Sequence, residues 1–137
     1  MAIGERIRYM RKRQGMTQKE LGKAIGFDDR TADVRIAQYE AGARTPKEYL
    51  VNSIAETLKV SPMALGVPDI DSFAGVMHTL FALEDLYGIR LGNVGENASN
   101  INPLLKMLSK WEEQAARLEA GEITKKQYDA WRYNYQT

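Results

Sequence analysis

The segment that most constrains this chain is residues 17–42. Thr17 is followed three residues later by Glu20, the spacing of a capping box, in which each side chain accepts a hydrogen bond from a free amide at a helix start. A helix is therefore predicted to begin here. It is predicted to end at Gly26, because glycine readily takes the left-handed conformation that ends helices. A second short helix is predicted to end at Gly42, so the segment predicts two short helices joined by a turn.

Three further short helices are predicted around this segment. The first begins at Ile3 and is stopped by Gly15, and the fourth begins where Thr45 and Glu48 repeat the capping-box spacing. Ser61 opens the fifth. The apolar faces are formed by Ile3, Ile7, Met10, Leu50, Ile54 and Leu58. Two helices joined by a tight turn among such neighbours are typical of a helix-turn-helix motif.

Glycine also appears inside one predicted helix. Gly22 lies within the helix that Thr17 begins, where glycine costs roughly 1 kcal/mol relative to alanine. We expect another helix to approach closely at this position, because a residue without a side chain leaves room for it.

Charge is distributed unevenly, although the net charge is only +1. Residues 1–65 carry 12 Lys or Arg against 8 Asp or Glu, whereas residues 66–137 carry 7 against 10. This pattern favours a basic N-terminal module that binds a polyanion. The acidic remainder of the chain would not take part in that binding. An ordinary fluctuation in solvated surface charge is the alternative.

The residue content argues against other classes of function. The chain has no cysteine, and His78 is its one histidine, so no metal site is predicted. No phosphate loop, nucleophile elbow or zinc signature is present, so we expect no catalytic residues, no cofactor and no enzyme. The first residues lack the apolar core of a signal peptide, and no run is long enough to span a bilayer. We therefore expect a cytoplasmic protein without a membrane partner.

Several separate stretches resemble, in the same order, the Cro and phage-repressor (xenobiotic-response-element) helix-turn-helix family. They are Ile3–Arg8, Gly15–Leu21, Tyr39–Gly42, Pro46 and Leu58–Ser61. The resemblance covers residues 1–66. It implies a five-helix DNA-binding domain that commonly acts as a dimeric transcriptional regulator on double-stranded DNA.

The chain departs from this family between its second and third helices. Residues 27–33 make the connection longer than the family usually has, so either the turn is longer or the third helix starts earlier. At about 100° per residue, Val34 and Gln38 lie on the face away from the core. Gln38 can pair with adenine, and Val34 can contact a thymine methyl group. Arg35 can reach a guanine or a phosphate from the edge of this face.

Other residues are predicted to position the DNA backbone. Thr17 and Gln18 stand at a helix start, where free amides and the helix dipole favour a phosphate. The resemblance implies that Arg11, Arg44 and Lys47 lie where this fold meets the strand. For each basic residue, a solvated surface role is the alternative.

The extended connection also carries several charged residues. Arg30 joins the DNA-facing side if the third helix extends that far. Asp33 is repelled by phosphates unless it accepts from cytosine or caps the helix, and we favour the cap. Asp28 and Asp29 are expected to fold back on Arg30 or on a helix start. These acidic residues favour a rival function, an antitoxin-like or adaptor module that uses the fold to bind protein without binding DNA.

Residues 67–137 are predicted to form a mainly helical region. A helix following Asp71 and Ser72 is apolar over so wide an arc that it needs two neighbours. Residues 88–92 are interpreted as a short strand. A long helix is predicted from near Pro103 to Gly121, and Thr124 with Gln127 caps a last helix. This region could serve for dimerisation, for sensing a ligand or for binding another protein. We favour dimerisation, because a two-fold symmetric dimer matches a palindromic operator.

These observations predict an all-α protein with two parts. Residues 1–66 form the five-helix DNA-binding domain, and residues 67–137 form a helical region with at most a short strand or hairpin. The predicted function is sequence-specific binding of a double-stranded DNA operator by a homodimeric regulator that acts as a repressor. The sequence contains no pattern that identifies a small-molecule effector.

Overall fold

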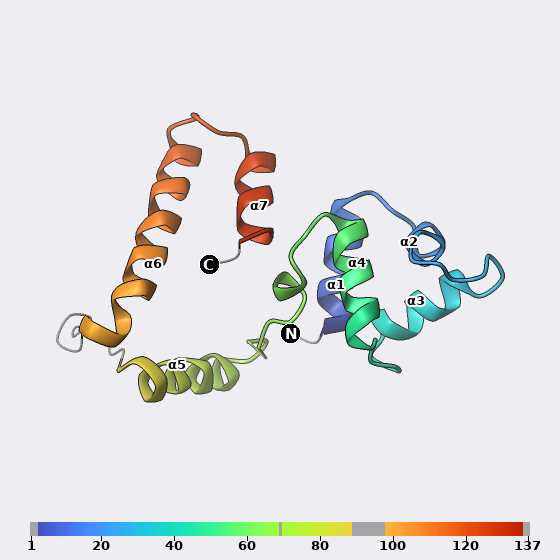
Figure 1. Ribbon diagram of the computed structural model, residues 1–137, viewed down its shortest axis with the longest axis horizontal. Coiled ribbons are helices and arrows are strands. Elements are labelled where there is room, and N and C mark those ends of the chain that lie inside the picture. Colours follow the sequence, from blue (N-terminus) through green and yellow to red (C-terminus); the bar gives the residue numbers. More distant parts are fainter. Residues whose placement is uncertain (1–2, 69, 89–97, 136–137) are drawn as a thin grey trace. The chain divides into compact units, whose positions relative to one another are not determined.

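The computed structural model describes residues 3–68, 70–88 and 98–135. Within these ranges, all regular secondary structure is helical, as the sequence predicts. The predicted strand at 88–92 lies outside the described residues except for Gly88. The elements are α1 (Ile3–Arg13), α2 (Gln18–Ala24), α3 (Ala32–Glu40), α4 (Glu48–Leu58), the 3-10 turn η1 (Pro62–Ala64), α5 (Phe73–Tyr87), α6 (Ala98–Glu119) and α7 (Lys125–Tyr133) (Figure 1).

The chain divides into two compact units. The first unit runs to Pro68 and includes a second stretch of chain that begins at Tyr133. The second unit comprises the residues between them, up to Arg132. The sequence places the division after residue 66 and assigns the whole remainder to one region.

The core of the first unit combines the predicted apolar faces of α1 and α4 with residues of α2, α3, the chain after α4 and Tyr133. Ile7 and Met10 of α1, Leu21 of α2 and Ile36 of α3 are fully buried. Burial of such side chains stabilises the fold by about 1.5–3 kcal/mol each. The rest of the buried core is Tyr39, Leu50, Ile54, Ala55, Leu58, Val60, Leu65 and Tyr133.

Helix α2 begins and ends where the sequence predicts. Thr17 occupies the N-cap position and forms the complete capping box with Glu20. Gly26, just past the end of the helix, has a φ of 95°. A Cβ atom on Gly22 would lie 2.6 Å from the carbonyl oxygen of Ala32, the first residue of α3. The predicted close approach of another helix at Gly22 is therefore confirmed.

Two predicted helix starts differ from the structure. Helix α4 begins at Glu48 with Lys47 at its N-cap position, so the capping box predicted for Thr45 and Glu48 does not start it. Helix α3 has Thr31 at its N-cap position, which shows that the predicted Asp33 cap is wrong. The Asp33 carboxylate accepts a hydrogen bond from the Val34 amide instead, at 2.8 Å. The spacing of capping residues alone therefore does not fix the residue at which α3 and α4 begin.

The second unit contains the helices of the C-terminal region. Helix α6 begins at Ala98, earlier than the predicted start near Pro103, and it runs antiparallel to α7 (Figure 1). The Trp111 indole N–H donates to the Tyr128 hydroxyl at 2.9 Å, which joins these two helices. Thr124 and Gln127 exchange the two hydrogen bonds of the predicted capping box.

Candidate nucleic-acid interface

A buried ion pair holds α1 against the end of α3. The Arg11 guanidinium donates from Nε to Glu40 Oε1 at 2.5 Å and from Nη2 to Glu40 Oε2 at 3.2 Å. Gln18 at the start of α2 donates its side-chain amide to the same carboxylate, at 2.8 Å. Arg11 Nη1 also donates to the Met16 carbonyl at 2.7 Å. Three helices are thus joined through Glu40, and the orientation of α3 depends on this network.

The connection between α2 and α3 is a longer turn rather than an earlier helix, because α3 begins only at Ala32. Asp28 accepts a hydrogen bond from the Arg30 amide at 2.9 Å, which matches the expectation that it folds back on this residue. Asp29 instead faces α2, where its carboxylate lies 3.1 Å from Lys23 Nζ and 3.4 Å from Lys19 Nζ. The hydrogen bond and the positive charge of these lysines lower the pKa of Asp29.

The outer face of α3 carries the residues predicted to read bases. The Val34 side chain is 52% exposed, and Gln38 is half-buried one turn further along the same face. Arg35 stacks on the Phe27 ring, with its guanidinium carbon 3.8 Å from the ring centroid. Stacking uses the flat face of a guanidinium and leaves the N–H groups at its edge. Phe27, in the extended turn, therefore positions Arg35 beside the outer face of α3.

A basic hollow adjoins this face at the loop between α3 and α4. It is open, with a volume of about 360 Å³, and it is lined by Arg35, Tyr39, Arg44, Thr45, Lys47, Tyr49 and Leu50. The backbone amide of Arg44 donates to the Gln38 carbonyl at 3.2 Å, which places this arginine next to the outer face of α3. Three cationic side chains and three hydroxyl groups around one hollow provide donors for phosphate oxygens.

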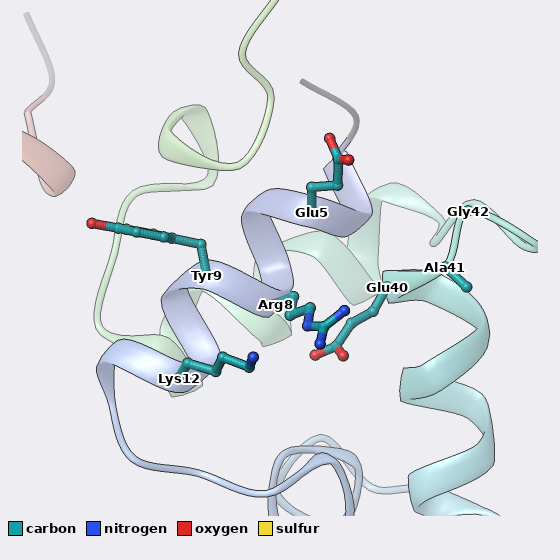
Figure 2. Close-up of a pocket in the computed structure, with 7 residues that line it drawn as sticks. All are labelled: Glu5, Arg8, Tyr9, Lys12, Glu40, Ala41 and Gly42. Atoms are coloured by element: carbon teal, nitrogen blue, oxygen red, sulfur yellow. The ribbon is translucent and has the colours of Figure 1, made fainter. Parts of the chain in front are cut away.

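A second hollow lies between α1 and the end of α3. Figure 2 shows its lining, to which α1 contributes Glu5, Arg8, Tyr9 and Lys12, and the end of α3 contributes Glu40, Ala41 and Gly42. It is open and measures about 500 Å³. Its charges are mixed, and its carboxylate Glu40 already accepts from Arg11 and Gln18. The basic hollow between α3 and α4 is therefore better suited to a polyanion.

The structure separates the predicted positioning residues into two groups. Arg44 and Lys47 are exposed in the basic hollow. Arg11 is buried in the ion pair with Glu40, and Gln18 is half-buried against the same carboxylate. Thr17 is exposed at the start of α2. The predicted contacts of these residues with DNA stay predictions, as does that of Arg30, which is exposed in the extended turn.

Tyr49 was not predicted to belong to the site. Its side chain is 65% exposed in the first turn of α4 and lines the basic hollow. The sequence contains a signal for it, since Tyr49 lies off the apolar stripe of α4 and directly follows Lys47 and Glu48. Thr45, expected to cap a helix, also lines the hollow.

The short helices, the buried link between α1 and α3, and the basic face beside α3 are features of a helix-turn-helix domain. Residues 7–65 match the family model described as helix-turn-helix, and this domain belongs to that family, of the Cro/C1 type. Among solved structures, the chain is similar to the transcriptional regulator BswR, with a TM-score of 0.48 and 25% identity over 64% of this chain and 97% of that chain. A search of curated proteins found no match. None of the helices in the described part of the chain combines the length and the apolar character that a bilayer span needs.

Proposed function

We propose that this protein is a sequence-specific regulator of transcription that binds double-stranded DNA as a homodimer and represses by occupying an operator. The observation that carries the proposal is the basic hollow of Arg35, Arg44 and Lys47 beside the exposed outer face of α3. Membership of residues 7–65 in the helix-turn-helix family supports DNA binding.

The two parts of this surface have different roles in the proposal. Arg44 and Lys47 bind phosphates, which supplies affinity that does not depend on base sequence. Gln38 and Val34 enter the major groove, where a glutamine recognises adenine and an apolar side chain contacts the thymine methyl group. Arg35, stacked on Phe27, reaches a guanine or a phosphate at the edge of the groove.

We expect duplex DNA to bind with a steep dependence on salt. Each phosphate contact contributes roughly 0.9 to the slope of log affinity against log salt concentration. Replacing Arg44 and Lys47 together by alanine should therefore lower that slope by about 2. Fluorescence anisotropy with genomic fragments selected on the wild-type protein measures the slope. Lys126→Ala, an exposed basic residue of α7, is the matched control and should leave the slope unchanged.

Replacing Gln38 by alanine should act on specificity. We expect it to weaken binding to the selected fragment by about 1–3 kcal/mol and to change binding to random DNA much less, because phosphate contacts remain. If the wild-type protein retains no duplex at low salt, the regulator proposal is wrong and the protein-binding rival stands. The charge that favoured that rival is partly neutralised within the domain, since Asp29 pairs with Lys19 and Lys23.

The dimer is proposed to form through α5 in the second unit. Phe73 is 93% exposed, and Met77, Leu80 and Phe81 are each about half exposed on the same side of the helix. A contiguous exposed apolar face of this kind marks an interaction site. A second copy fits it because two-fold protein symmetry matches a palindromic operator.

Replacing Phe73 and Leu80 together by glutamate should convert the dimer to a monomer, because the new charges would have to be buried in the interface. Sedimentation velocity measures the change. Ala82→Glu places one such charge on the opposite side of α5, about 180° from Phe73, and should leave the dimer intact. An unchanged sedimentation coefficient for the double variant would place the dimer contact elsewhere.

A further inference from the structure

The first unit contains a segment that lies far outside the family match. Tyr133 is 9% exposed and belongs to the apolar core of the first unit, although the helix-turn-helix match ends at residue 65. Its carbonyl accepts a hydrogen bond from the Ser61 amide at 2.8 Å. The next residue, Asn134, donates its side-chain amide to the Lys59 carbonyl at 3.0 Å. Two hydrogen bonds, to main-chain atoms of Lys59 and Ser61, thus hold Tyr133 and Asn134 against the stretch of chain that follows α4.

The Tyr133 side chain is surrounded by residues of α1. Its ring meets the ring of Tyr9 edge to face, with centroids 6.3 Å apart and planes at 83°. The guanidinium carbons of Arg6 and Arg13 lie 5.7 Å and 5.0 Å from the centre of the Tyr133 ring. Arg6 Nε also donates to the Ala64 carbonyl at 3.0 Å, which connects this cluster to η1. An aromatic side chain between two cations and a second aromatic ring forms a specific contact.

Helix α1, which contacts Tyr133, also contacts α3. On one side α1 carries Arg6, Tyr9 and Arg13 around Tyr133, and on another it carries Arg11, which is paired with Glu40 of α3. Gly4 of α1 lies directly against the carbonyls at the end of α3. A change in the position or order of α1 therefore reaches α3 through packed contacts.

We propose that the surface formed by Arg6, Tyr9, Arg13 and Ser61 is a docking site for Tyr133 and Asn134 of the same chain, and that its occupancy controls the DNA affinity of the helix-turn-helix domain through α1. The part about affinity rests on the proposed DNA-binding function, whereas the docking itself does not. Residues 70–132 leave the first unit after Pro68 and rejoin it at Tyr133. A partner or ligand of the second unit that withdraws Tyr133 would thereby weaken DNA binding.

Replacing Tyr133 by alanine in the full chain tests both parts. The midpoint of thermal unfolding should fall by roughly 10 °C, because a large buried side chain is lost. At temperatures where circular dichroism shows a folded variant, affinity for a selected genomic duplex should fall by about fivefold or more. Tyr133→Phe is the matched control. It keeps the ring and loses the 3.4 Å contact between the Tyr133 and Tyr9 hydroxyls, so it should stay much closer to the wild type than Tyr133→Ala does.

A chain that ends at Arg132 provides a second arm, in which the docking segment is supplied as a separate peptide. A synthetic peptide of residues 131–137 should raise its unfolding midpoint in a saturable manner, and the same peptide with alanine at position 133 should not. No stabilisation by the peptide, or an unchanged midpoint for Tyr133→Ala, overturns the docking site. Full DNA affinity in a folded but less stable Tyr133→Ala variant overturns the control of affinity. If the wild-type protein itself retains no DNA, the proposed function is wrong. The unfolding midpoints then still show whether Tyr133 and Asn134 dock on the first unit.

Discussion

Replacing Glu40 by alanine is expected to lower the free energy of unfolding by about 3–5 kcal/mol, because the change leaves a buried arginine without its counter-charge. The Arg11 and Glu40 side chains are only 10% and 4% exposed. The pair is therefore largely shielded from solvent. Arg11 would keep its hydrogen bond to the Met16 carbonyl, and one neutral acceptor does not offset a buried positive charge.

The same variant is expected to lose DNA affinity at temperatures where it remains folded. Glu40 is the residue at which α1, α2 and α3 are joined, through Arg11 and Gln18. Without it, α3 loses the polar contacts that hold its end against α1 and α2. Urea unfolding followed by circular dichroism measures stability, and anisotropy with the selected duplex measures affinity.

Two further variants separate the buried pair from charge in general. Arg11→Met combined with Glu40→Leu removes both charges and should recover most of the stability lost in Glu40→Ala, because an apolar pair of similar volume can replace a buried ion pair. Asp29→Ala also removes a carboxylate paired with basic residues, but that pair is exposed, so the unfolding midpoint should stay close to that of the wild type. If Glu40→Ala and Asp29→Ala lowered the free energy of unfolding equally, burial of the ion pair would not be the cause of the effect.

Replacing Gly4 by alanine is expected to destabilise the domain by at least about 1–3 kcal/mol, the usual cost of overpacking. A Cβ atom at this position would lie 2.1 Å from the carbonyl oxygen of Tyr39 and 2.8 Å from that of Glu40. Both neighbours are backbone atoms in the last turn of α3, so no side chain can rotate away. Helix α1 must move as a body, and the geometry of the ion pair between Arg11 and Glu40 must change with it.

Gly66→Ala is the matched control for this prediction. A Cβ atom on Gly66 would meet nothing within 4 Å, and alanine usually stabilises a compatible position slightly by restricting the unfolded chain. Thermal unfolding of the two variants should therefore differ clearly in midpoint. A Gly4→Ala variant as stable as the wild type would show that α1 and α3 can separate without cost.

The parts of the fold that depend on local sequence could be predicted. The capping boxes at Thr17 and Thr124 are formed, because both partners lie within one helical turn. The apolar stripe of α4 is buried as predicted, since helical period alone brings Leu50, Ile54 and Leu58 to one face. The exception is Thr45, where the same spacing occurs and α4 begins later. There, Thr45 lies in the loop that lines the basic hollow.

The candidate site was predictable to a smaller extent. The residues that face outward on α3 follow from helical period once Ile36 and Tyr39 are placed in the core. The extended turn required the structure, because nothing local shows that Phe27 supports the Arg35 guanidinium or that Asp29 turns toward α2. Arg11 is the clearest case. The sequence cannot distinguish an exposed arginine that binds phosphate from one that is buried against Glu40.

The sequence by itself determined the helical class, the family of residues 7–65 and the outer face of α3, because periodicity, capping and motif order are properties of neighbouring residues. The tertiary structure alone decided which charges are buried together and which segment completes the first unit. Arg11 and Glu40 are separated by 29 positions, and Tyr9 and Tyr133 by 124. Contacts over such separations depend on how helices pack, and no local pattern in the chain encodes them.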